Sequence, residues 1–363
     1  MKEGDIYSKL LIKPLDFEPS FKDWKVIGTL NPAAVRMNDD RISLYIRVAE
    51  QAVSKEKGKM VCPIIISENS LKMEYHHFNK EDIMKKGEKG EIYLKSGICR
   101  LPHISHFRRA IIDNDGEYIE YLDHRPAFTG IPGESDFGVE DPRITKIGNK
   151  YFMTYVGVSE KQGVSTYLAV SKDCIKWKRL GLIFREQNKD VVLFPERIKG
   201  KYVALNRPET LFSFSKPGIW ISYSKDLMYW GNDKSLMKPR NKTWENDRIG
   251  GGAPPIKTKE GWLVIYHGVK YYSNKRTYSV GAVLLDLKNP EKIIARSPLN
   301  NPLIIPKEEY DKHGYISNVI FPSGAVKSLD GNYLLIYCGG ADSVTTLKKV
   351  KMNYIFNSME YSK

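Results

Sequence analysis

The chain of 363 residues is poor in cysteine, with only Cys62, Cys99, Cys174 and Cys338. These four residues lie far apart in the sequence, and none belongs to a CxxC pair. A zinc site built on cysteines is therefore not expected, and neither is any other metal site. We interpret the four as free thiols in a reducing compartment.

Long apolar runs are also missing. No stretch approaches the roughly 20 apolar residues that span a bilayer. The first 17 residues carry charges throughout and contain no apolar segment of signal-peptide length. We therefore expect a soluble, cytoplasmic protein that does not associate with a membrane.

Acidic residues are in deficit. Lys and Arg together number 57 against 43 for Asp and Glu, which gives a formal net charge of +14. Such an excess favours anionic partners, from nucleic acids to a small phosphate. Because the basic residues are scattered and do not form runs interleaved with exposed aromatics, we expect no nucleic-acid binding.

Helical periodicity is scarce, and short strand-like runs bounded by polar turns replace it. Five such runs resemble one another, and each directly follows a polar turn such as Gly148-Asn149-Lys150 or Asp330-Gly331-Asn332. The five runs are ISLYIRV (42–48), YFMTYVGV (151–158), KYVALNR (201–207), WLVIYHGV (262–269) and YLLIYCGG (333–340). The last four begin about 50–70 residues apart, whereas the first interval has room for an insertion.

A second repeated unit follows several of these runs. STYLAVSKDCIKW (165–177) is echoed by GIWISYSKDLMYW (218–230), and YSVGAVLLDLKNP (278–290) is a looser copy. Repeats worth about four short strands predict an all-β fold, a five-bladed β-propeller. A large β-sandwich or two stacked β-domains is the alternative. No low-complexity linker divides the chain, so we predict a single domain over residues 1–363 with a core at about 25–345.

One further strand is predicted near the C-terminal end of that core. The stretch Lys348-Lys349-Val350-Lys351 alternates weakly. Lysines discourage pairing at the open edge of a sheet, so we predict an outer edge strand here.

Polar residues interrupt strand ends in five places. They are Asn31-Pro32 with Arg47, FGVEDPR (137–143), the segment from Asn188 to Pro208, RIGGGAPP (248–255) with Tyr266-His267-Gly268, and Gly339-Gly340-Ala341-Asp342. Taken singly, each has a structural explanation: a turn held by a local ion pair, a flexible glycine loop or a satisfied core histidine. In a ring, however, Lys189, Arg207, Arg248 and His267 would converge from three consecutive repeats. Converging cations beside glycines form a site for a doubly charged anion such as phosphate.

These segments together resemble glycoside hydrolase family 130, the β-mannoside phosphorylases and related β-mannosidases. GVEDPRI and the pair GG-PP-I and YHGV are the most specific matches, and the likeness runs from about residue 25 to residue 345. The resemblance implies a five-bladed propeller and makes Asp141 of GVEDPR the catalytic acid. It assigns phosphate to Lys189, Arg207, Arg248, His267 and Tyr278. It assigns the β-mannoside to Asn31, Arg47, Glu140, Arg143 and Asp342.

The chemistry implied is inverting phosphorolysis with inorganic phosphate as a substrate and no cofactor. Phosphate is its own nucleophile, so the enzyme needs one acid and no base carboxylate. In the family the acid acts through the mannose 3-hydroxyl, and the product is α-mannose 1-phosphate. Because Asp141 must be protonated at the start of turnover, we expect a raised pKa, with Glu140 supplying like-charge repulsion.

Two departures from the family pattern stand out: Asn206 in NRP replaces a His, and RIGGGAPP replaces the KIGAGPPP of some members. Arg for Lys keeps the charge. Chain length, the long segment 49–135 and RIGGGAPP favour β-1,2-mannobiose or β-1,2-oligomannan as substrate. Phosphorolysis of β-1,4-mannosyl-glucose or -N-acetylglucosamine, hydrolysis by a β-mannosidase, and a non-catalytic glycan-binding propeller remain alternatives. The relatives also suggest a homo-oligomer such as a dimer.

Overall fold

The computed structural model describes residues 5–68, 72–87, 90–210, 212 and 214–362, and their regular structure is almost entirely antiparallel strand. Two short helices, α1 (Glu309–Lys312) and α2 (Met352–Asn357), and two 3-10 turns, Pro14–Asp16 and Lys80–Asp82, complete the described elements. The prediction of an all-β fold is confirmed.

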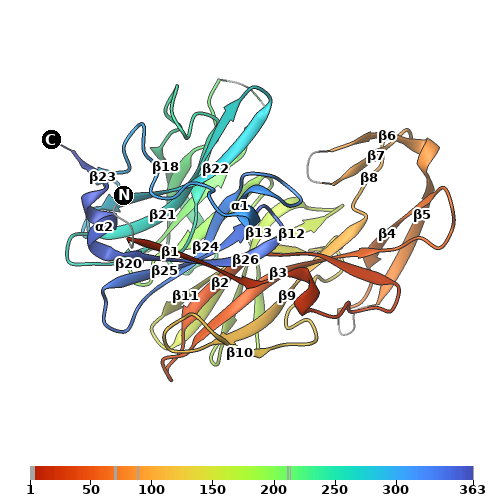
Figure 1. The fold of residues 1–363 in the computed structure, drawn as a ribbon, viewed down its shortest axis with the longest axis horizontal. Coiled ribbons are helices and arrows are strands. Elements are labelled where there is room, and N and C mark those ends of the chain that lie inside the picture. The colour runs from red at the N-terminus through yellow and green to blue at the C-terminus, as the bar shows by residue number, and fades with distance from the viewer. Residues whose placement is uncertain (1–4, 69–71, 88–89, 211, 213, 363) are drawn as a thin grey trace.

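Three sheets of four strands come from the first two thirds of the chain (Figure 1). The first contains β2 (Trp24–Arg36), β3 (Ile42–Ala52), β9 (His103–Ile112) and β10 (Ile119–Leu122). The second contains β11 (Val139–Ile147), β12 (Lys150–Ser159), β13 (Gly163–Ser171) and β14 (Lys178–Phe184). The third contains β15 (Asn188–Leu193), β16 (Tyr202–Pro208), β17 (Ile219–Ser224) and β18 (Trp230–Met237).

Two more sheets follow, and each recruits a strand from near a chain end. The fourth contains β19 (Arg248–Gly251), β20 (Ile256–Lys257), β21 (Trp262–Tyr272), β22 (Lys275–Leu285), β23 (Ile293–Arg296) and β27 (Glu360–Tyr361). The fifth contains β24 (Ile320–Lys327), β25 (Tyr333–Gly340), β26 (Val344–Lys351) and β1 (Ile6–Ile12). The sheets therefore extend beyond the predicted core of residues 25–345.

The five predicted runs occupy the same place in five different sheets. They form β3, β12, β16, β21 and β25, each paired with the strand that leads its sheet: β2, β11, β15, β19 and β24, respectively. The turns before them contain residues with positive φ, such as Gly148 at 57° and Gly331 at 72°. A positive φ matches the backbone of tight hairpin turns, which explains the glycines there.

Core packing lies mainly between neighbouring sheets. Five apolar clusters join the first sheet to the second, the second to the third, the third to the fourth, the fourth to the fifth and the fifth to the first. Each cluster is fully buried at its centre, with Tyr45, Trp262 and Tyr337 among the largest side chains. A sheet in this protein is therefore stabilised by both of its neighbours.

The segment between β3 and β9 forms two small sheets that stand to one side of the main body (Figure 1). One pairs β4 (Lys59–Ile65) with β5 (Met73–Asn79). The other joins β6 (Ile83–Lys86), β7 (Ile92–Leu94) and β8 (Cys99–Arg100). We call residues 53–102 the insertion, because they interrupt the first sheet.

The predicted edge strand at Lys348 to Lys351 is wrong. These residues lie in β26, which pairs with β25 on one side and β1 on the other. Lys348 is buried, and its Nζ lies 2.7 Å from Asp311 Oδ2. The local sequence around a lysine does not show whether it is buried in an ion pair or lies on the open edge of a sheet.

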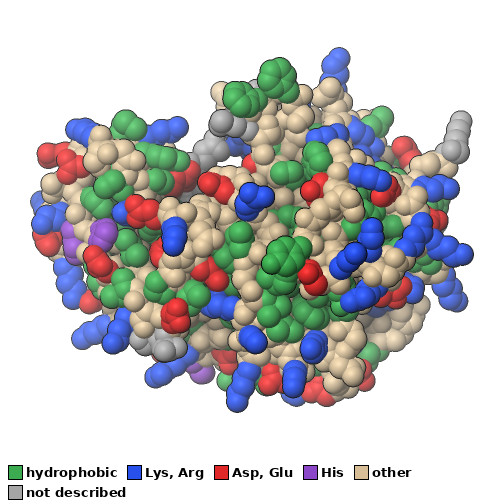
Figure 2. Space-filling model, turned by 180° about the vertical axis from the view of Figure 1, so that it is seen from behind, with side chains coloured by type: hydrophobic (Ala, Val, Ile, Leu, Met, Phe, Trp, Pro, Cys, Tyr) green, Lys and Arg blue, Asp and Glu red, His purple; other side chains and the backbone are tan. Residues whose placement is uncertain are grey.

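The surface carries its excess of positive charge in dispersed form. Figure 2 shows Lys and Arg side chains spread over one face of the molecule with acidic side chains among them. All four cysteines are free thiols, as predicted, and Cys99 alone among them is exposed. In the part of the chain that the structure describes, no helix is long and apolar enough to cross a membrane.

Candidate active site

The leading strands of three neighbouring sheets carry a polar residue at the same kind of irregularity. The register of β2, β11 and β15 shifts at Asn31, Asp141 and Asp190, respectively. These three residues have φ of 46°, 48° and 54°. Asn and Asp tolerate the left-handed region better than most residues, and a bulge re-aims the side chain out of the ladder.

Asp141 is held from two sides. Asn31 Nδ2 donates a hydrogen bond of 2.8 Å to Asp141 Oδ1. Arg47, on β3, spans the two adjacent carboxylates, with Nη1 3.1 Å from Asp141 Oδ1 and Nη2 2.7 Å from Glu140 Oε1. Its Nε donates to Ser105 Oγ at 3.1 Å, so the guanidinium is fixed in orientation. The predicted sugar-binding residues Asn31, Arg47 and Glu140 therefore surround the predicted acid.

The electrostatics of Asp141 contradict the expected raised pKa. Burial pushes this pKa up, but the guanidiniums of Arg47 and Arg143 and the Asn31 hydrogen bond outweigh burial, so the pKa lies below its usual value. The prediction rested on repulsion from Glu140, but Arg47 binds both carboxylates and offsets that repulsion.

Arg143 is buried and mainly contacts main chain. Its Nη1 donates to the carbonyl of Asp141 at 3.0 Å, and its Nε donates to the carbonyl of Gly252. The guanidinium also lies over the ring of Phe321, 5.5 Å from the centroid. This geometry suits a residue that holds the bulge at Asp141 in place, although Nη2 is buried without a hydrogen-bond partner among the described residues.

Lys189 and Asp342 lie near the residues that contact the acid. Lys189 Nζ lies 3.9 Å from Glu140 Oε2. Asp342 follows β25 with a φ of 49°, and its negative charge acts to raise the pKa of Arg47 and that of Tyr278.

The remaining predicted phosphate ligands gather around Asp190. Arg207 Nε donates to Asp190 Oδ2 at 2.6 Å, and the same oxygen lies 3.7 Å from His267 Nε2. The ring of His267 in turn lies 6.1 Å from that of Tyr278. Burial raises the pKa of Tyr278, so its hydroxyl remains a hydrogen-bond donor.

The charge of His267 differs from the prediction, which made it a cation. Burial lowers its pKa to about 4, and Arg207 and Arg143 add to that effect against the opposite influence of Asp190. The ring is therefore neutral near pH 7. Its Nδ1 is buried and has no hydrogen-bond partner among the described residues. An anion entering the site would meet a polar imidazole and no additional positive charge.

Three carboxylates at this site escaped the sequence analysis as site residues: Asp190, Glu209 and Asp247. Glu209 Oε1 accepts a hydrogen bond from Arg207 Nη1 and lies 3.6 Å from Arg248 Nη1. Asp247 Oδ2 lies 3.1 Å from Arg248 Nε and 3.2 Å from Arg276 Nε. Glu209 stands two residues after Arg207, the spacing that shares a strand face, and this signal could have revealed it. The predicted cations are thus largely neutralised by their own carboxylates.

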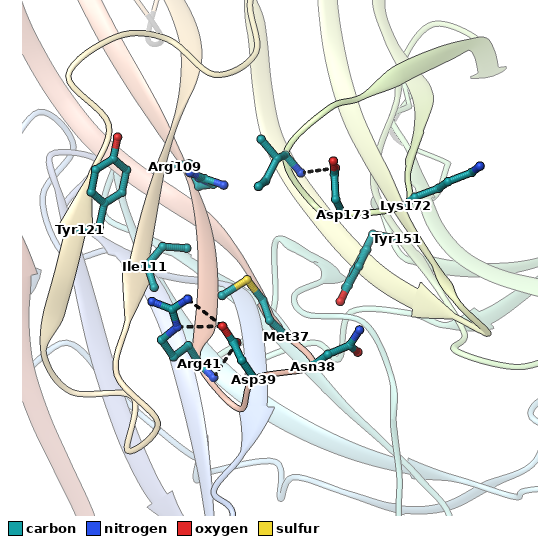
Figure 3. A pocket seen from close by; sticks show the side chains of 11 residues that line it. Met37, Asn38, Asp39, Arg41, Arg109, Ile111, Tyr121, Tyr151, Lys172 and Asp173 are labelled. Carbon is teal, nitrogen blue, oxygen red and sulfur yellow. Dashed lines mark hydrogen bonds and ion pairs between the residues drawn. The ribbon is translucent and has the colours of Figure 1, made fainter.

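A separate cleft of about 580 Å³ lies between the first and second sheets (Figure 3). Met37, just beyond the end of β2, and Arg109, Tyr121 and Tyr151 are among its lining residues. None of the predicted site residues lines it. Among the described residues, no group of three or more His, Cys, Asp or Glu side chains is arranged to hold a metal ion.

Comparison with known proteins identifies the family of the chain. Residues 121–361 match the profile of glycoside hydrolase family 130, described as beta-1,4-mannooligosaccharide phosphorylase. A beta-1,2-mannobiose phosphorylase of Listeria innocua is 34% identical over 96% of both chains. A 1,2-beta-oligomannan phosphorylase of a Thermoanaerobacter species is 41% identical over 67% of this chain and 78% of its own.

The structural match is equally extensive. The Listeria innocua beta-1,2-mannobiose phosphorylase, solved with beta-1,2-mannobiose, superposes with a TM-score of 0.87 over 98% of this chain and 99% of its own, at 34% identity. A solved protein of Parabacteroides distasonis shares the fold with a TM-score of 0.69 at 22% identity. The chain therefore belongs to glycoside hydrolase family 130.

Proposed function

We infer that this protein is an inverting phosphorylase that cleaves β-1,2-linked mannosides with inorganic phosphate. The observation that carries this inference is the buried carboxylate of Asp141 beside Lys189, which belongs to a basic cluster with Arg207 and Arg248. The β-1,2 linkage is supported by the names of the relatives in Listeria innocua and Thermoanaerobacter.

The proposed reaction exchanges one bond for another. Phosphate held by Lys189, Arg207, Arg248, His267 and Tyr278 attacks C1 of the mannose, and the C1–O bond to the leaving sugar breaks on the opposite face. Asp141 takes up a proton from solvent when phosphate binds, supplies the proton that ends on the leaving oxygen by way of the mannose 3-hydroxyl, and is left as a carboxylate. The products are α-mannose 1-phosphate and a shortened sugar. The cations orient the nucleophile in line and offset the repulsion between phosphate and the carboxylates.

Asn31, Arg47, Glu140 and Asp342 are proposed to hold the mannose in this reaction, and Arg143 to position Asp141. No cofactor or metal is required by this chemistry, because phosphate brings its own nucleophilic oxygen. Arg47 has two tasks in this proposal, since its guanidinium also keeps Asp141 ionised until substrates arrive.

We further propose that the five main sheets are the blades of one closed propeller domain over residues 1–363. The apolar clusters that join each sheet to the next, and the fifth back to the first, support this proposal. The free thiols support a cytoplasmic location. The dimer suggested by the family stays a prediction. Light scattering tests it, because it measures the molar mass of the protein in solution.

The experiment is to incubate the protein with β-1,2-mannobiose, with and without inorganic phosphate. Mannose 1-phosphate and free mannose are both measured. We expect mannose 1-phosphate to form only when phosphate is present. Release of two mannoses regardless of phosphate would make the protein a β-mannosidase and overturn the proposal, and β-1,4-mannobiose serves as the linkage control.

A variant tests the acid within the same assay. Asp141→Asn keeps the shape and the Asn31 contact but carries no transferable proton, so we expect a loss of about 10²–10⁴-fold in turnover. Circular dichroism checks that the variant is folded. Substantial phosphorolysis by a folded Asp141→Asn protein would exclude Asp141 as the acid.

A further inference from the structure

Arg207 and Arg248 are each held by two carboxylates in the same arrangement. Arg207 Nε donates to Asp190 Oδ2 at 2.6 Å, and its Nη1 donates to Glu209 Oε1. Arg248 Nε donates to Asp247 Oδ2 at 3.1 Å, and its Nη1 lies 3.6 Å from the same Glu209 oxygen. The two guanidiniums therefore converge at their Nη1 atoms, and an aspartate holds each of them at Nε.

The two kinds of carboxylate have different consequences for phosphate. A guanidinium binds an anion through a pair of its N–H groups. A carboxylate at Nη1, where the two guanidiniums converge, occupies an atom that phosphate would use. A carboxylate at Nε leaves Nη1 and Nη2 to other acceptors and fixes the direction in which they point. Asp247 is therefore placed to orient Arg248, whereas Glu209 is placed to compete with phosphate.

The backbone that carries Asp247 is fixed to β21. The Asp247 amide donates to the carbonyl of Val269 at 2.9 Å, and Arg248 lies opposite Val269 in the register of β19 and β21. One residue earlier, Asn246 Oδ1 accepts a hydrogen bond of 2.8 Å from the Tyr271 amide, and Asn246 Nδ2 donates to the Tyr271 carbonyl at 3.2 Å. These bonds continue the pairing past the end of β19, so the Asp247 carboxylate projects from a fixed backbone.

Arg276 gives the Asp247 carboxylate a second cation. Its Nε lies 3.2 Å from Asp247 Oδ2, the oxygen that also binds Arg248. Arg276 lies opposite Tyr271 in the hairpin of β21 and β22, and its guanidinium is 5.2 Å from the centroid of the Tyr271 ring. The Tyr271 hydroxyl donates to Asn274 Oδ1 at 2.9 Å, which holds the ring in place. Asp247 thus links Arg248 to this hairpin (Figure 1).

The same hairpin carries two other proposed phosphate ligands, His267 on β21 and Tyr278 on β22. Burial raises the pKa of Tyr278, and the positive charges of Arg248 and Arg276 act against that rise. Tyr278 is therefore within electrostatic reach of both arginines. The contact with Asp247 holds Arg248, which comes from β19, in a fixed relation to the two ligands on the hairpin.

We propose that Asp247 is a positioning residue of the phosphate site: its carboxylate, shared with Arg276, orients Arg248 so that the Nη groups bind phosphate. This inference rests on the proposed function. A long arginine side chain loses rotamer freedom when it binds an anion, and the contact at Nε removes part of that freedom beforehand. The side chains of Asp247, Arg248 and Arg276 are 22%, 21% and 29% exposed, and ion pairs this accessible contribute little to stability.

The test is Asp247→Asn, which keeps the shape of the side chain and removes the charge that both guanidiniums bind. Titration calorimetry with inorganic phosphate measures Kd, and steady-state kinetics measure KM for phosphate and for β-1,2-mannobiose. We expect both phosphate constants to rise about threefold to tenfold, the effect of one weakened hydrogen bond to a charged group. The loss should appear in KM for phosphate, and KM for β-1,2-mannobiose at saturating phosphate should change by less than about twofold.

Asp39→Asn is the matched control. Asp39 also binds a nearby arginine, with Oδ2 2.7 Å from Arg41 Nη2, but it lines the separate cleft (Figure 3). This variant should leave every constant unchanged. Thermal melting checks that both variants are folded, and a general loosening of the fold would raise KM for the sugar as well.

A second variant tests the part played by Arg276. Arg276→Gln should weaken phosphate binding in the same direction, and the double variant with Asp247→Asn should be no weaker than Asp247→Asn alone, because the two residues act as one unit. Additive losses would place Arg276 on phosphate itself and overturn the shared role.

The outcomes separate this proposal from the proposed function. No mannose 1-phosphate from the wild type would refute the phosphorylase. With an active wild type, an unchanged phosphate Kd in folded Asp247→Asn would refute the positioning role alone. A tighter phosphate Kd would also refute it, because Asp247 would then compete with the anion in the way expected of Glu209.

Discussion

At the scale of single residues, the proposed acid is ionised before substrates bind. The guanidinium of Arg47 stabilises the charged forms of both Asp141 and Glu140. An ionised Asp141 cannot donate a proton. Bound phosphate would bring negative charge beside these carboxylates and weaken the hold of the cations on them. A carboxyl near an added negative charge has a higher pKa, so phosphate itself prepares the acid.

This coupling predicts proton uptake on phosphate binding. Titration calorimetry near pH 7 in buffers of different ionisation enthalpy measures the number of protons exchanged. Because the pKa of Asp141 starts low and rises, we expect the wild type to take up more protons than Asp141→Asn, whose amide cannot titrate. Equal proton exchange in the two proteins would show that Asp141 does not change its charge in this step.

The Glu209 carboxylate is expected to compete with phosphate for the same guanidiniums. Its carboxylate contacts both Arg207 and Arg248, the two guanidiniums proposed to bind phosphate. Glu209→Gln removes the charge and frees both, so KM for phosphate should fall by about tenfold, the effect of about 1.4 kcal/mol. Steady-state kinetics with varied phosphate measure this.

The control for that prediction is Glu260→Gln, which removes a carboxylate from an exposed turn and should change nothing. A rise in KM for phosphate in Glu209→Gln would mean that Glu209 orients the arginines and does not compete with the anion.

At the scale of elements, the bulges of the leading strands depend on small neighbours. Gly250 on β19 packs against the Asp190 bulge: an added Cβ would overlap Asp190 Oδ2 and lie 2.5 Å from His267 Cε1. Gly250→Ala must therefore displace the Asp190–Arg207 pair. We expect KM for phosphate to rise at least about tenfold, because misplacing a bound group by a fraction of an ångström is costly.

Gly231→Ala on β18 is the matched variant, because a Cβ there would meet nothing within 4 Å. It should leave the kinetics with phosphate unchanged. A wild-type KM in Gly250→Ala would show that the Asp190 bulge is not part of the phosphate site.

Some strands of this fold could be predicted from the sequence and others could not. The runs at 42–48 and 262–269 were predictable as equivalent strands, because alternation and turn chemistry are local properties. The edge strand at Lys348 was wrong, because its burial depends on β1 and Asp311, which are distant in sequence. Arg207, Arg248 and His267 do lie near one another, around Asp190 and Glu209, but the charge state of His267 depends on burial that no motif records.

At the scale of the whole molecule, the fifth sheet joins residues from near both ends of the described chain. Ile12 on β1 is fully buried in the cluster between the fifth and first sheets. Ile12→Ala should lower the free energy of unfolding by about 2–5 kcal/mol, the range for such core truncations. Leu15→Ala, whose side chain is 88% exposed, should stay within about 0.5 kcal/mol of the wild type.

Chemical denaturation followed by tryptophan fluorescence measures both variants. Similar midpoints for the two would mean that β1 contributes little to the stability of the sheet it joins.

The pairing of β1 with β26 also affects synthesis. The strand β1 finds its partner only after Val344–Lys351 has left the ribosome, more than 330 residues later. Until then the first sheet exposes the apolar face that the fifth sheet later buries. The nascent chain must therefore stay protected from aggregation while the residues between β1 and β26 are made, and we expect its yield in cells to depend on chaperones that bind unfinished chains.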